Sequence, residues 1–167
     1  LLPEELSASF LQSYMPHFCS AVDLVVSPSA GMADVLRALG VQAPIEVIPN
    51  GVELERYQQA CGDCRAELGY SPEDILLVYS GRLAPEKNLE FLLQAFVAVA
   101  ETLPAVRLLV IGGGPDKEQL IQAASQSSVP DRIQFTGMLP YESLPRYLAM
   151  CDAFVTASVT EVHPLSV

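Results

Sequence analysis

Between residues 75 and 156 the chain alternates short apolar runs with longer amphipathic segments. The runs predict strands at 75–79, 107–111, 133–135 and 153–156, and the segments between them predict helices at 88–102, 116–125 and 141–150. In the first helix, apolar residues recur every three or four positions, which is typical of a helix packed on a sheet: Leu89, Leu92, Leu93, Phe96, Val99, Ala100 and Leu103. Four strands joined by three crossover helices predict an α/β fold with a Rossmann-like, doubly wound parallel sheet.

The first 50 residues show the same alternation in a shorter form. Helices are predicted at 4–20 and from Ser29, a favourable N-cap, through Ala38, with Gly40 just beyond the end. Strands are predicted at 23–27 and 45–48. The turn-forming run Pro49-Asn50-Gly51 then breaks the pattern, and residues 52–74 form a polar connector with short helical pieces. We therefore place a domain boundary at about residue 50, with one domain at 1–50 and a second at 51–167.

The charge of the chain indicates which kinds of partner it can bind. The 167 residues are half apolar, which is enough to bury a sizeable core, but 20 acidic residues oppose 9 basic ones, for a net charge of -11. Such a charge repels nucleic acid and anionic lipid, so any anion site must be local. The most apolar stretch, residues 89–100, is too short for a membrane span and contains Glu90 and Gln94. The chain opens on Leu1 without a basic, then apolar leader, so we expect a fragment or a processed product.

The cysteines favour a structural interpretation over a metal or redox site. Cys61 and Cys64 have the spacing of half a zinc site or of a redox pair, but no second such pair follows, and His17 and His163 are isolated in the sequence. The structural alternative is that this stretch leads into a short helix over residues 64–68, which needs neither a metal ion nor a disulfide. Reduced thiols fit the cytoplasm.

Arg82 and Lys87 lie where the strand at 75–79 gives way to the helix at 88–102. A turn from strand to helix presents backbone N–H groups, and these two side chains add a planar fork and a point charge. This combination, which includes Gly81, predicts a site for a nucleotide diphosphate. The alternative is a pair of solvated surface charges.

The usual strand order of such sheets, 3-2-1-4, brings the loops after the first and fourth strands together at the crevice where ligands bind. Glu161, in the second of these loops, would then face Arg82 and Lys87. A carboxylate opposes a diphosphate but suits a neutral polyhydroxyl group attached to it, so a sugar is the natural candidate. The alternative is an exposed glutamate in a loop.

Two further loops end at the same edge of the sheet. Gly112, Gly113 and Gly114 follow the second strand and let backbone approach a ligand closely, whereas Lys117 replaces the glycine that a dinucleotide fingerprint requires. A nicotinamide or flavin site is therefore not favoured. The loop after the third strand, which contains Met138 and Leu139, is placed to offer backbone groups to a base.

Taken in order, five motifs resemble glycosyltransferase family four, the group 1 retaining glycosyltransferases with a GT-B fold. They are Val25-Val26-Ser27-Pro28-Ser29, Val47-Ile48-Pro49-Asn50-Gly51-Val52, Gly81-Arg82 through Lys87-Asn88, Ile111 through Pro115, and Phe135-Thr136-Gly137. The resemblance implies that residues 1–50 are the end of an acceptor domain with the interdomain linker. Residues 51–167 are then an incomplete donor-binding domain.

The resemblance also implies roles. Arg82 and Lys87 would stabilise the departing nucleoside diphosphate electrostatically, and Glu161 would contact hydroxyls of the donor sugar. A second glutamate, expected on the ribose, would stand at position 169, beyond Val167. Transfer would retain the anomeric configuration by a front-face displacement with oxocarbenium character, and would need neither a metal ion nor another cofactor.

The sequence departs from the family pattern after Glu161, where it reads Val162-His163-Pro164 instead of Gly-Phe-Gly. Pro164 has no N–H group, so the backbone of His163, Leu165 and Ser166 is left to hold the donor. The family's further strands and closing helix lie beyond the fourth strand. We therefore expect an exposed apolar sheet edge and no activity from the fragment alone.

The implied partners are a nucleotide-diphosphate sugar, with UDP or GDP as its nucleotide, and an acceptor that is a sugar, a lipid or a small molecule. The implied location is the cytoplasm, peripheral to the inner membrane face in the full-length protein. Two alternatives stay open: a noncatalytic nucleotide- or carbohydrate-binding module, and a phosphorylase or hydrolase of the same architecture.

Overall fold

The computed structural model describes residues 13–58 and 65–158. The chain divides into two compact units, with a boundary in the sequence between Val52 and Glu53.

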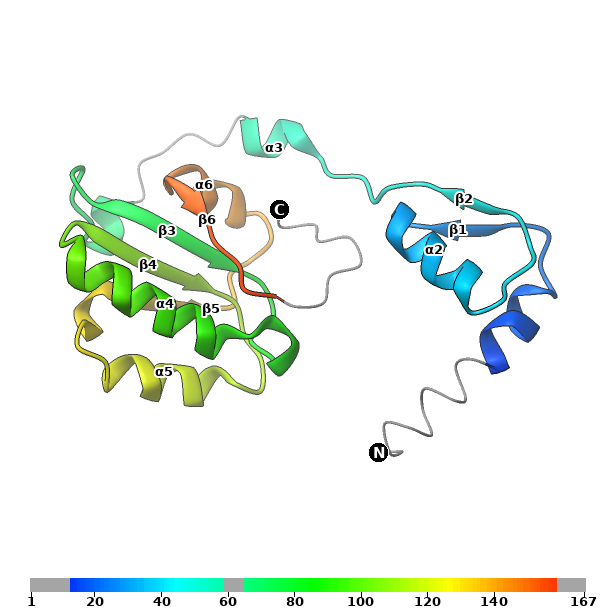
Figure 1. The fold of residues 1–167 in the computed structure, drawn as a ribbon. Coiled ribbons are helices and arrows are strands. Elements are labelled where there is room, and N and C mark those ends of the chain that lie inside the picture. The colour runs from blue at the N-terminus through cyan, green and yellow to red at the C-terminus, as the bar shows by residue number, and fades with distance from the viewer. Residues whose placement is uncertain (1–12, 59–64, 159–167) are drawn as a thin grey trace. The chain divides into compact units, whose positions relative to one another are not determined.

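The first unit is a small parallel β-α-β arrangement preceded by a helical segment at residues 13–19. Its elements are β1 (Val25–Ser27), α2 (Ala30–Ala38) and β2 (Ile45–Val47), and the two strands pair in parallel with Val25 opposite Ile45 (Figure 1). Cys19, Leu36 and Val41 form the buried centre of this unit. The Cys19 thiol is thus part of the packing.

The boundaries of α2 confirm the signals in the sequence. The Ser29 hydroxyl accepts a hydrogen bond from the Met32 N–H at 3.2 Å, as an N-cap does. At the other end Gly40 has a φ of +95°, a left-handed conformation that glycine adopts at low cost.

The second unit is a doubly wound α/β layer structure. It begins with α3 (Leu54–Gln58) and the 3-10 helix η1 (Ala66–Leu68). Four strands and three longer helices follow: β3 (Ile75–Ser80), α4 (Leu89–Thr102), β4 (Val106–Ile111), α5 (Lys117–Ser125), β5 (Ile133–Gly137), α6 (Leu144–Ala149) and β6 (Ala153–Phe154). Two further 3-10 helices, η2 (Pro85–Lys87) and η3 (Pro130–Arg132), precede α4 and β5. The strands are all parallel and lie in the order β5-β4-β3-β6, which confirms the predicted fold and the 3-2-1-4 order.

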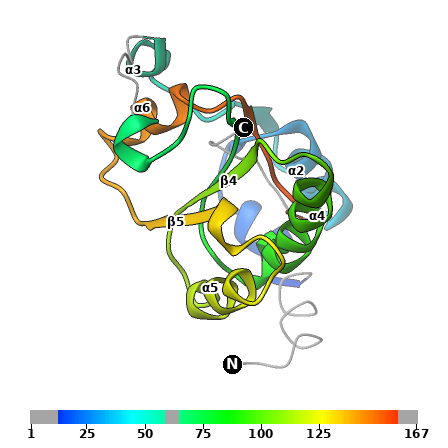
Figure 2. The ribbon, with the colours of Figure 1, turned by 90° about the vertical axis from the view of Figure 1, so that its left-hand side faces the viewer.

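Side chains alternate between two cores along the central strands, as the pleat of a strand requires. Tyr79 and Leu108 pack on the side covered by α4 and α5, whereas Val78 and Leu109 pack on the side covered by α6. Figure 2 shows the helices on these two opposite sides of the sheet. The alternation explains why the central strands read as continuous apolar runs.

The predicted helix at 141–150 begins later in the structure than the sequence indicates. Residues 141–143 form a turn, and α6 starts at Leu144, followed at once by Pro145, a residue suited to a first helical turn. The residues before α4 form η2 and end at Asn88, which has a φ of +50°. The predicted helix start at Asn88 therefore agrees with the structure to within one residue, and a 3-10 helix and a left-handed residue form the turn before it.

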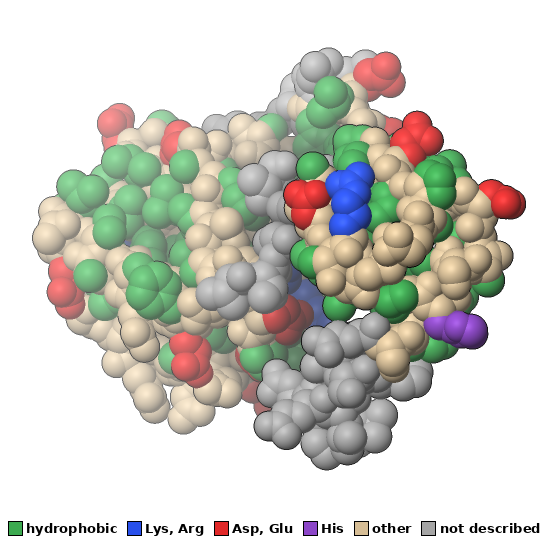
Figure 3. Space-filling model, turned by 45° about the vertical axis from the view of Figure 1, so that its right-hand side comes forward, with side chains coloured by type: hydrophobic (Ala, Val, Ile, Leu, Met, Phe, Trp, Pro, Cys, Tyr) green, Lys and Arg blue, Asp and Glu red, His purple; other side chains and the backbone are tan. Residues whose placement is uncertain are grey.

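The apolar pattern of α4 is confirmed only in part. Leu89, Leu93, Phe96 and Ala100 are buried against the sheet, but Val99 and Leu103 are exposed. Apolar side chains also reach the surface elsewhere in both units, among them Val26, Val47, Phe91 and Met138. Figure 3 shows such side chains on one face, where acidic side chains are scattered and basic ones are few.

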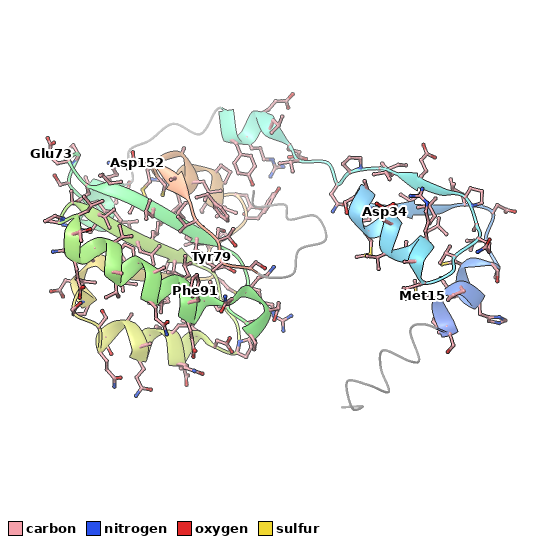
Figure 4. The ribbon with its side chains drawn as sticks, in the orientation of Figure 1. Met15, Asp34, Glu73, Tyr79, Phe91 and Asp152 are labelled. Carbon is pink, nitrogen blue, oxygen red and sulfur yellow. The ribbon has the colours of Figure 1, made fainter. Side chains whose placement is uncertain are left out.

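A polar cluster holds β6 at the amino ends of the parallel strands, the end of the sheet that lies opposite the loops after β3 and β4. Arg65 donates hydrogen bonds to the carbonyls of Met150, at 2.8 Å, and Asp74, at 3.0 Å, and pairs with Asp152 at 2.9 Å. Asp152 also accepts the Leu76 N–H at 2.7 Å, and its own N–H donates to the Leu76 carbonyl. Asp152 lies at the start of β6 in Figure 4. This cluster fastens β6 to β3 although β6 has only two residues.

Within residues 13–58 and 65–158, no helix is both long enough and apolar enough to cross a bilayer. In the same part of the chain, no three His, Cys, Asp or Glu side chains gather as a metal ion would require.

Candidate functional site

A pocket of about 570 Å³ opens at the carboxyl ends of β3, β4 and β5. One side is formed by the loops after β3 and β4, and the other by the loop after β5 and the start of α6. Its lining residues are Ser80, Gly81, Arg82, Ile111, Gly112, Gly113, Gly114, Met138, Leu139, Tyr141 and Leu144. This edge of a doubly wound sheet is where such folds bind ligands.

Backbone hydrogen bonds join the three loops that form the pocket. The Gly81 N–H donates to the Ile111 carbonyl at 3.0 Å, and the Leu83 N–H donates to the Gly113 carbonyl at 2.9 Å. The Gly112 N–H in turn donates to the Gly137 carbonyl at 2.9 Å. The ladder of the sheet thus continues past the strand ends into the loops, so the pocket has a fixed floor.

The glycines at 112 and 114 allow the loops to pack on each other. A Cβ atom on Gly112, whose φ is +140°, would overlap the Gly81 carbonyl oxygen. A Cβ atom on Gly114 would lie 2.8 Å from the Leu83 nitrogen. The sequence predicted glycines here for close approach to a ligand, but the structure shows that their first requirement is close approach of one loop to another.

Tyr79 supports the loop that carries Arg82. Its ring is buried in the core between the sheet and α4. Its hydroxyl donates a hydrogen bond of 2.9 Å to the Arg82 carbonyl (Figure 4). The same hydroxyl leaves no room for a side chain at Gly81, where a Cβ atom would lie 2.8 Å away. The backbone at residues 81–82 is therefore held from below by a rigid aromatic residue.

The Arg82 side chain is exposed at the pocket. Among the described residues, its guanidinium makes no hydrogen bond and no ion pair, so its five N–H donors face solvent. The chain has a net charge of -11, so most of its surface repels anions. The Arg82 guanidinium provides a local positive charge at the pocket.

Lys87 lies close by in sequence but has a different setting. It is the last residue of η2, is half-buried, and is not among the residues that line the pocket. The structure thus places Arg82, Gly81, the three glycines, Met138 and Leu139 around one hollow, and Lys87 on the adjoining 3-10 helix.

The loop after β6 reaches the loop after β3, as the strand order predicts. The Ser158 hydroxyl donates a hydrogen bond of 3.3 Å to the Glu86 carbonyl, 72 residues earlier in the chain. Glu161, His163, Leu165 and Ser166, which the sequence also predicted at the site, lie outside the described residues. Their roles stay predictions.

Sequence reasoning missed Tyr141 and Leu144, which complete the apolar side of the pocket. Residues 141–143 were assigned to a helix, where an aromatic residue is expected to face the core. In the structure they form a turn, and the Tyr141 side chain is 56% exposed. The available signal was Pro140, which favours an extended or turn conformation just before Tyr141.

Comparison with protein families agrees with this geometry. Residues 63–167 match the family model described as glycosyl transferases group 1, and residues 3–56 match that of glycosyltransferase family 4. The chain belongs to the group 1 glycosyl transferases. The resemblance seen in the sequence motifs is thereby confirmed.

Curated relatives are similar over part of their length. Alpha-monoglucosyldiacylglycerol synthase from Streptococcus pneumoniae is 31% identical over 155 residues, which are 89% of this chain and 35% of the relative. A GDP-mannose-dependent alpha-(1-6)-phosphatidylinositol monomannoside mannosyltransferase from Mycolicibacterium smegmatis is 32% identical over 70% of this chain and 31% of its own. The chain spans about a third of the length of these two group 1 relatives.

Solved structures show the same fold. Sucrose-phosphate synthase from Thermosynechococcus elongatus aligns with a TM-score of 0.78 and 23% identity over 98% of this chain and 41% of that one. Anabaena HepE in complex with UDP aligns with a TM-score of 0.77 and 22% identity over 93% and 45% of the two chains.

Proposed function

We propose that the full-length protein transfers a sugar from a nucleoside diphosphate sugar to an acceptor, and that the pocket at the ends of β3, β4 and β5 holds the nucleotide half of the donor. The observation that carries this proposal is the pairing of two unlike walls in one hollow. An exposed guanidinium and a glycine-rich backbone form one wall, and Met138, Leu139 and Tyr141 form the other. A nucleoside diphosphate has the same two halves, an anionic diphosphate and an aromatic base.

The diphosphate belongs on the side of Arg82. A guanidinium offers parallel donors that match phosphate oxygens, and the exposed side chain is able to reach a ligand in the pocket. Lys87, on the adjoining η2, is proposed to add a second positive charge. When the bond between the anomeric carbon and the diphosphate oxygen breaks, both electrons leave with the diphosphate, and these cations stabilise the charge that develops there.

The sugar and its acceptor belong on the side of the loop after β6. The contact between Ser158 and Glu86 brings that loop to the rim of the β3 loop, three residues before Glu161. We propose that Glu161 accepts hydrogen bonds from hydroxyls of the donor sugar, and that the backbone of His163, Leu165 and Ser166 helps to hold it. The acceptor oxygen would then bond to the anomeric carbon on the face that the diphosphate leaves, with the acceptor proton passing to the departing diphosphate oxygen, so that configuration is retained.

Domain roles follow from the same proposal. The first unit is assigned to the acceptor domain and the second to the donor domain, with the family 4 and group 1 matches falling on residues 3–56 and 63–167 in turn. The relatives named above use a GDP-mannose donor in one case and form a glucosyl lipid in the other, judging from their names. The proposed acceptor is a lipid, a sugar or a small molecule. Transfer is proposed to need no metal ion and to take place in the cytoplasm.

The test is a transfer assay on the full-length protein with UDP- and GDP-sugars. Arg82→Ala is expected to lower kcat about a hundredfold or more, as loss of one transition-state donor does, with Lys87→Ala lowering it less. Arg37→Ala serves as the matched control, because Arg37 is an exposed arginine of α2 in an ion pair with Asp34 at 3.0 Å. It should transfer at the wild-type rate.

Three outcomes would overturn parts of the proposal. If the wild type transfers sugar and Arg82→Ala keeps its rate, the diphosphate assignment is wrong. If the wild type binds UDP or GDP without turnover on any acceptor, the noncatalytic module is correct instead. Release of free sugar or sugar phosphate would identify a hydrolase or a phosphorylase. The anomer of the product, read by NMR, decides retention, and activity in a chelator decides the metal requirement.

A further inference from the structure

The aromatic wall of the pocket is contacted from outside by the first helix of the second unit. In α3, the Arg56 guanidinium lies over the Tyr141 ring, with its central carbon 5.6 Å from the ring centroid. The Arg56 side chain also forms an ion pair with Glu53, the first residue of the second unit. The guanidinium therefore contacts both a carboxylate and an aromatic ring.

The neighbouring residue of α3, Tyr57, lies near the Tyr141 hydroxyl. Burial raises the pKa of Tyr57, and so does the neighbouring Tyr141 hydroxyl. Two consecutive residues of a five-residue helix thus lie near one side chain. The helix α3 itself packs against α6, which Tyr141 precedes by three residues.

Tyr141 needs such contacts to hold its orientation. The side chain is 56% exposed and sits in a turn, so the core does not fix it. An exposed side chain of this kind changes rotamer within nanoseconds unless neighbours restrain it. An aromatic ring has two faces, and Arg56 covers one of them. Tyr141 also lines the pocket, so the same side chain links Arg56 to the space for a planar ligand.

We propose that Arg56 is a positioning residue for the donor, which holds the Tyr141 ring as a stacking surface for the nucleobase. This inference rests on the proposed function. It extends the binding site beyond the pocket lining to α3, which begins two residues after the boundary between the two units. The segment that joins the units therefore ends in a helix that shapes the donor pocket.

Kinetics of the full-length protein test the proposal. Arg56→Ala is expected to raise the KM for the donor about two- to fivefold, the range of a partly exposed cation–π contact, with kcat within about twofold of wild type. Tyr141→Ala is expected to raise KM about tenfold or more, as loss of base stacking does. Tyr141→Phe keeps the ring and should stay near the wild-type KM. The double variant Arg56→Ala with Tyr141→Ala should be no worse than Tyr141→Ala alone, because Arg56 acts through the ring.

Two measurements separate positioning from a general loss of structure. Inorganic pyrophosphate has no base, so its inhibition constant should be the same in wild type and in the Arg56 and Tyr141 variants. Arg146→Ala is the matched control, because Arg146 ties α6 to η1 through Glu67 at 3.1 Å and is not among the residues lining the pocket. This control should leave the KM for the donor unchanged.

The results also distinguish this inference from the proposed function. An unchanged KM in Arg56→Ala, or equal weakening of pyrophosphate and donor, would overturn the positioning role while transfer by the wild type still stands. A wild-type protein that neither transfers sugar nor binds UDP or GDP would overturn the proposed function itself. Strictly additive effects in the double variant would show that Arg56 and Tyr141 act independently, which also contradicts the inference.

Discussion

Replacing Gly112 by alanine tests the finding that the loops of the pocket are packed backbone to backbone. At this position a side chain meets two obstacles: a φ of +140°, which residues with a Cβ atom rarely adopt, and the Gly81 carbonyl oxygen, which a Cβ atom would overlap. The neighbouring Gly113 is the matched control. A Cβ atom there would meet only the Met138 side chain, 3.0 Å away, and that side chain is 82% exposed and able to move.

The expected cost follows from these contacts. A strained φ costs about 1–3 kcal/mol. Relieving the overlap moves the Gly81 loop, which weakens the hydrogen bonds from Gly81 to Ile111 and from Leu83 to Gly113 by about 0.5–1.5 kcal/mol each. Gly112→Ala should therefore lower the free energy of unfolding by about 2–6 kcal/mol, a large part of the 5–15 kcal/mol of a typical domain. Gly113→Ala should change it by less than about 1 kcal/mol.

Urea unfolding followed by far-ultraviolet circular dichroism measures both variants against wild type. Hydrogen exchange adds a local test, because the Gly81 and Leu83 amides should lose protection in Gly112→Ala and keep it in Gly113→Ala. Equal unfolding midpoints for the two variants, with both amides still protected, would refute the packing argument.

Two further predictions concern groups away from the pocket. The Leu76 N–H, with the Arg65 guanidinium, lowers the pKa of Asp152, so this carboxylate stabilises the fold above the ordinary aspartate pKa of about 4 and ceases to do so as pH falls through the lowered value. Asp152→Asn should flatten the acid limb of the unfolding curve, and an unchanged limb would contradict the assignment. Burial raises the pKa of the Cys151 thiol to about 12, so at pH 8 its thiolate should be roughly a thousandfold rarer than that of an ordinary thiol. Alkylation of the native protein followed by peptide mass spectrometry should label Cys151 far more slowly than in urea, and labelling at equal rates would refute the prediction.

The sheet was predictable because its signals are local and mutually consistent. Apolar runs and helical spacing located the four strands of the larger sheet, the usual order of doubly wound sheets supplied their arrangement, and Ser29 and Gly40 marked the ends of α2. The start of α6 was less accurate, because turn chemistry competes there with the apolar pattern. Residues 141–143 form a turn after Pro140.

The pocket was predictable in outline for a related reason. Loops that follow parallel strands share one edge, so Arg82, the glycines and Met138 could be assigned together from their sequence positions. The contribution of α3 could not be predicted, because nothing in a polar connector indicates which distant side chain it will cover. The contact of Arg56 with Tyr141 spans 85 residues and depends on tertiary packing alone.

The cluster around Arg65 links this connector to the far end of the chain. Its guanidinium holds the residues that enter β6, and β6 leads directly to the loop in which Ser158 meets Glu86. Arg65, at the amino end of β6, thereby helps to position the loop that leaves the carboxyl end of the same strand. Exchanging that one basic residue would remove the hydrogen bonds to the Met150 and Asp74 carbonyls and the ion pair with Asp152, and so would loosen the entry into β6.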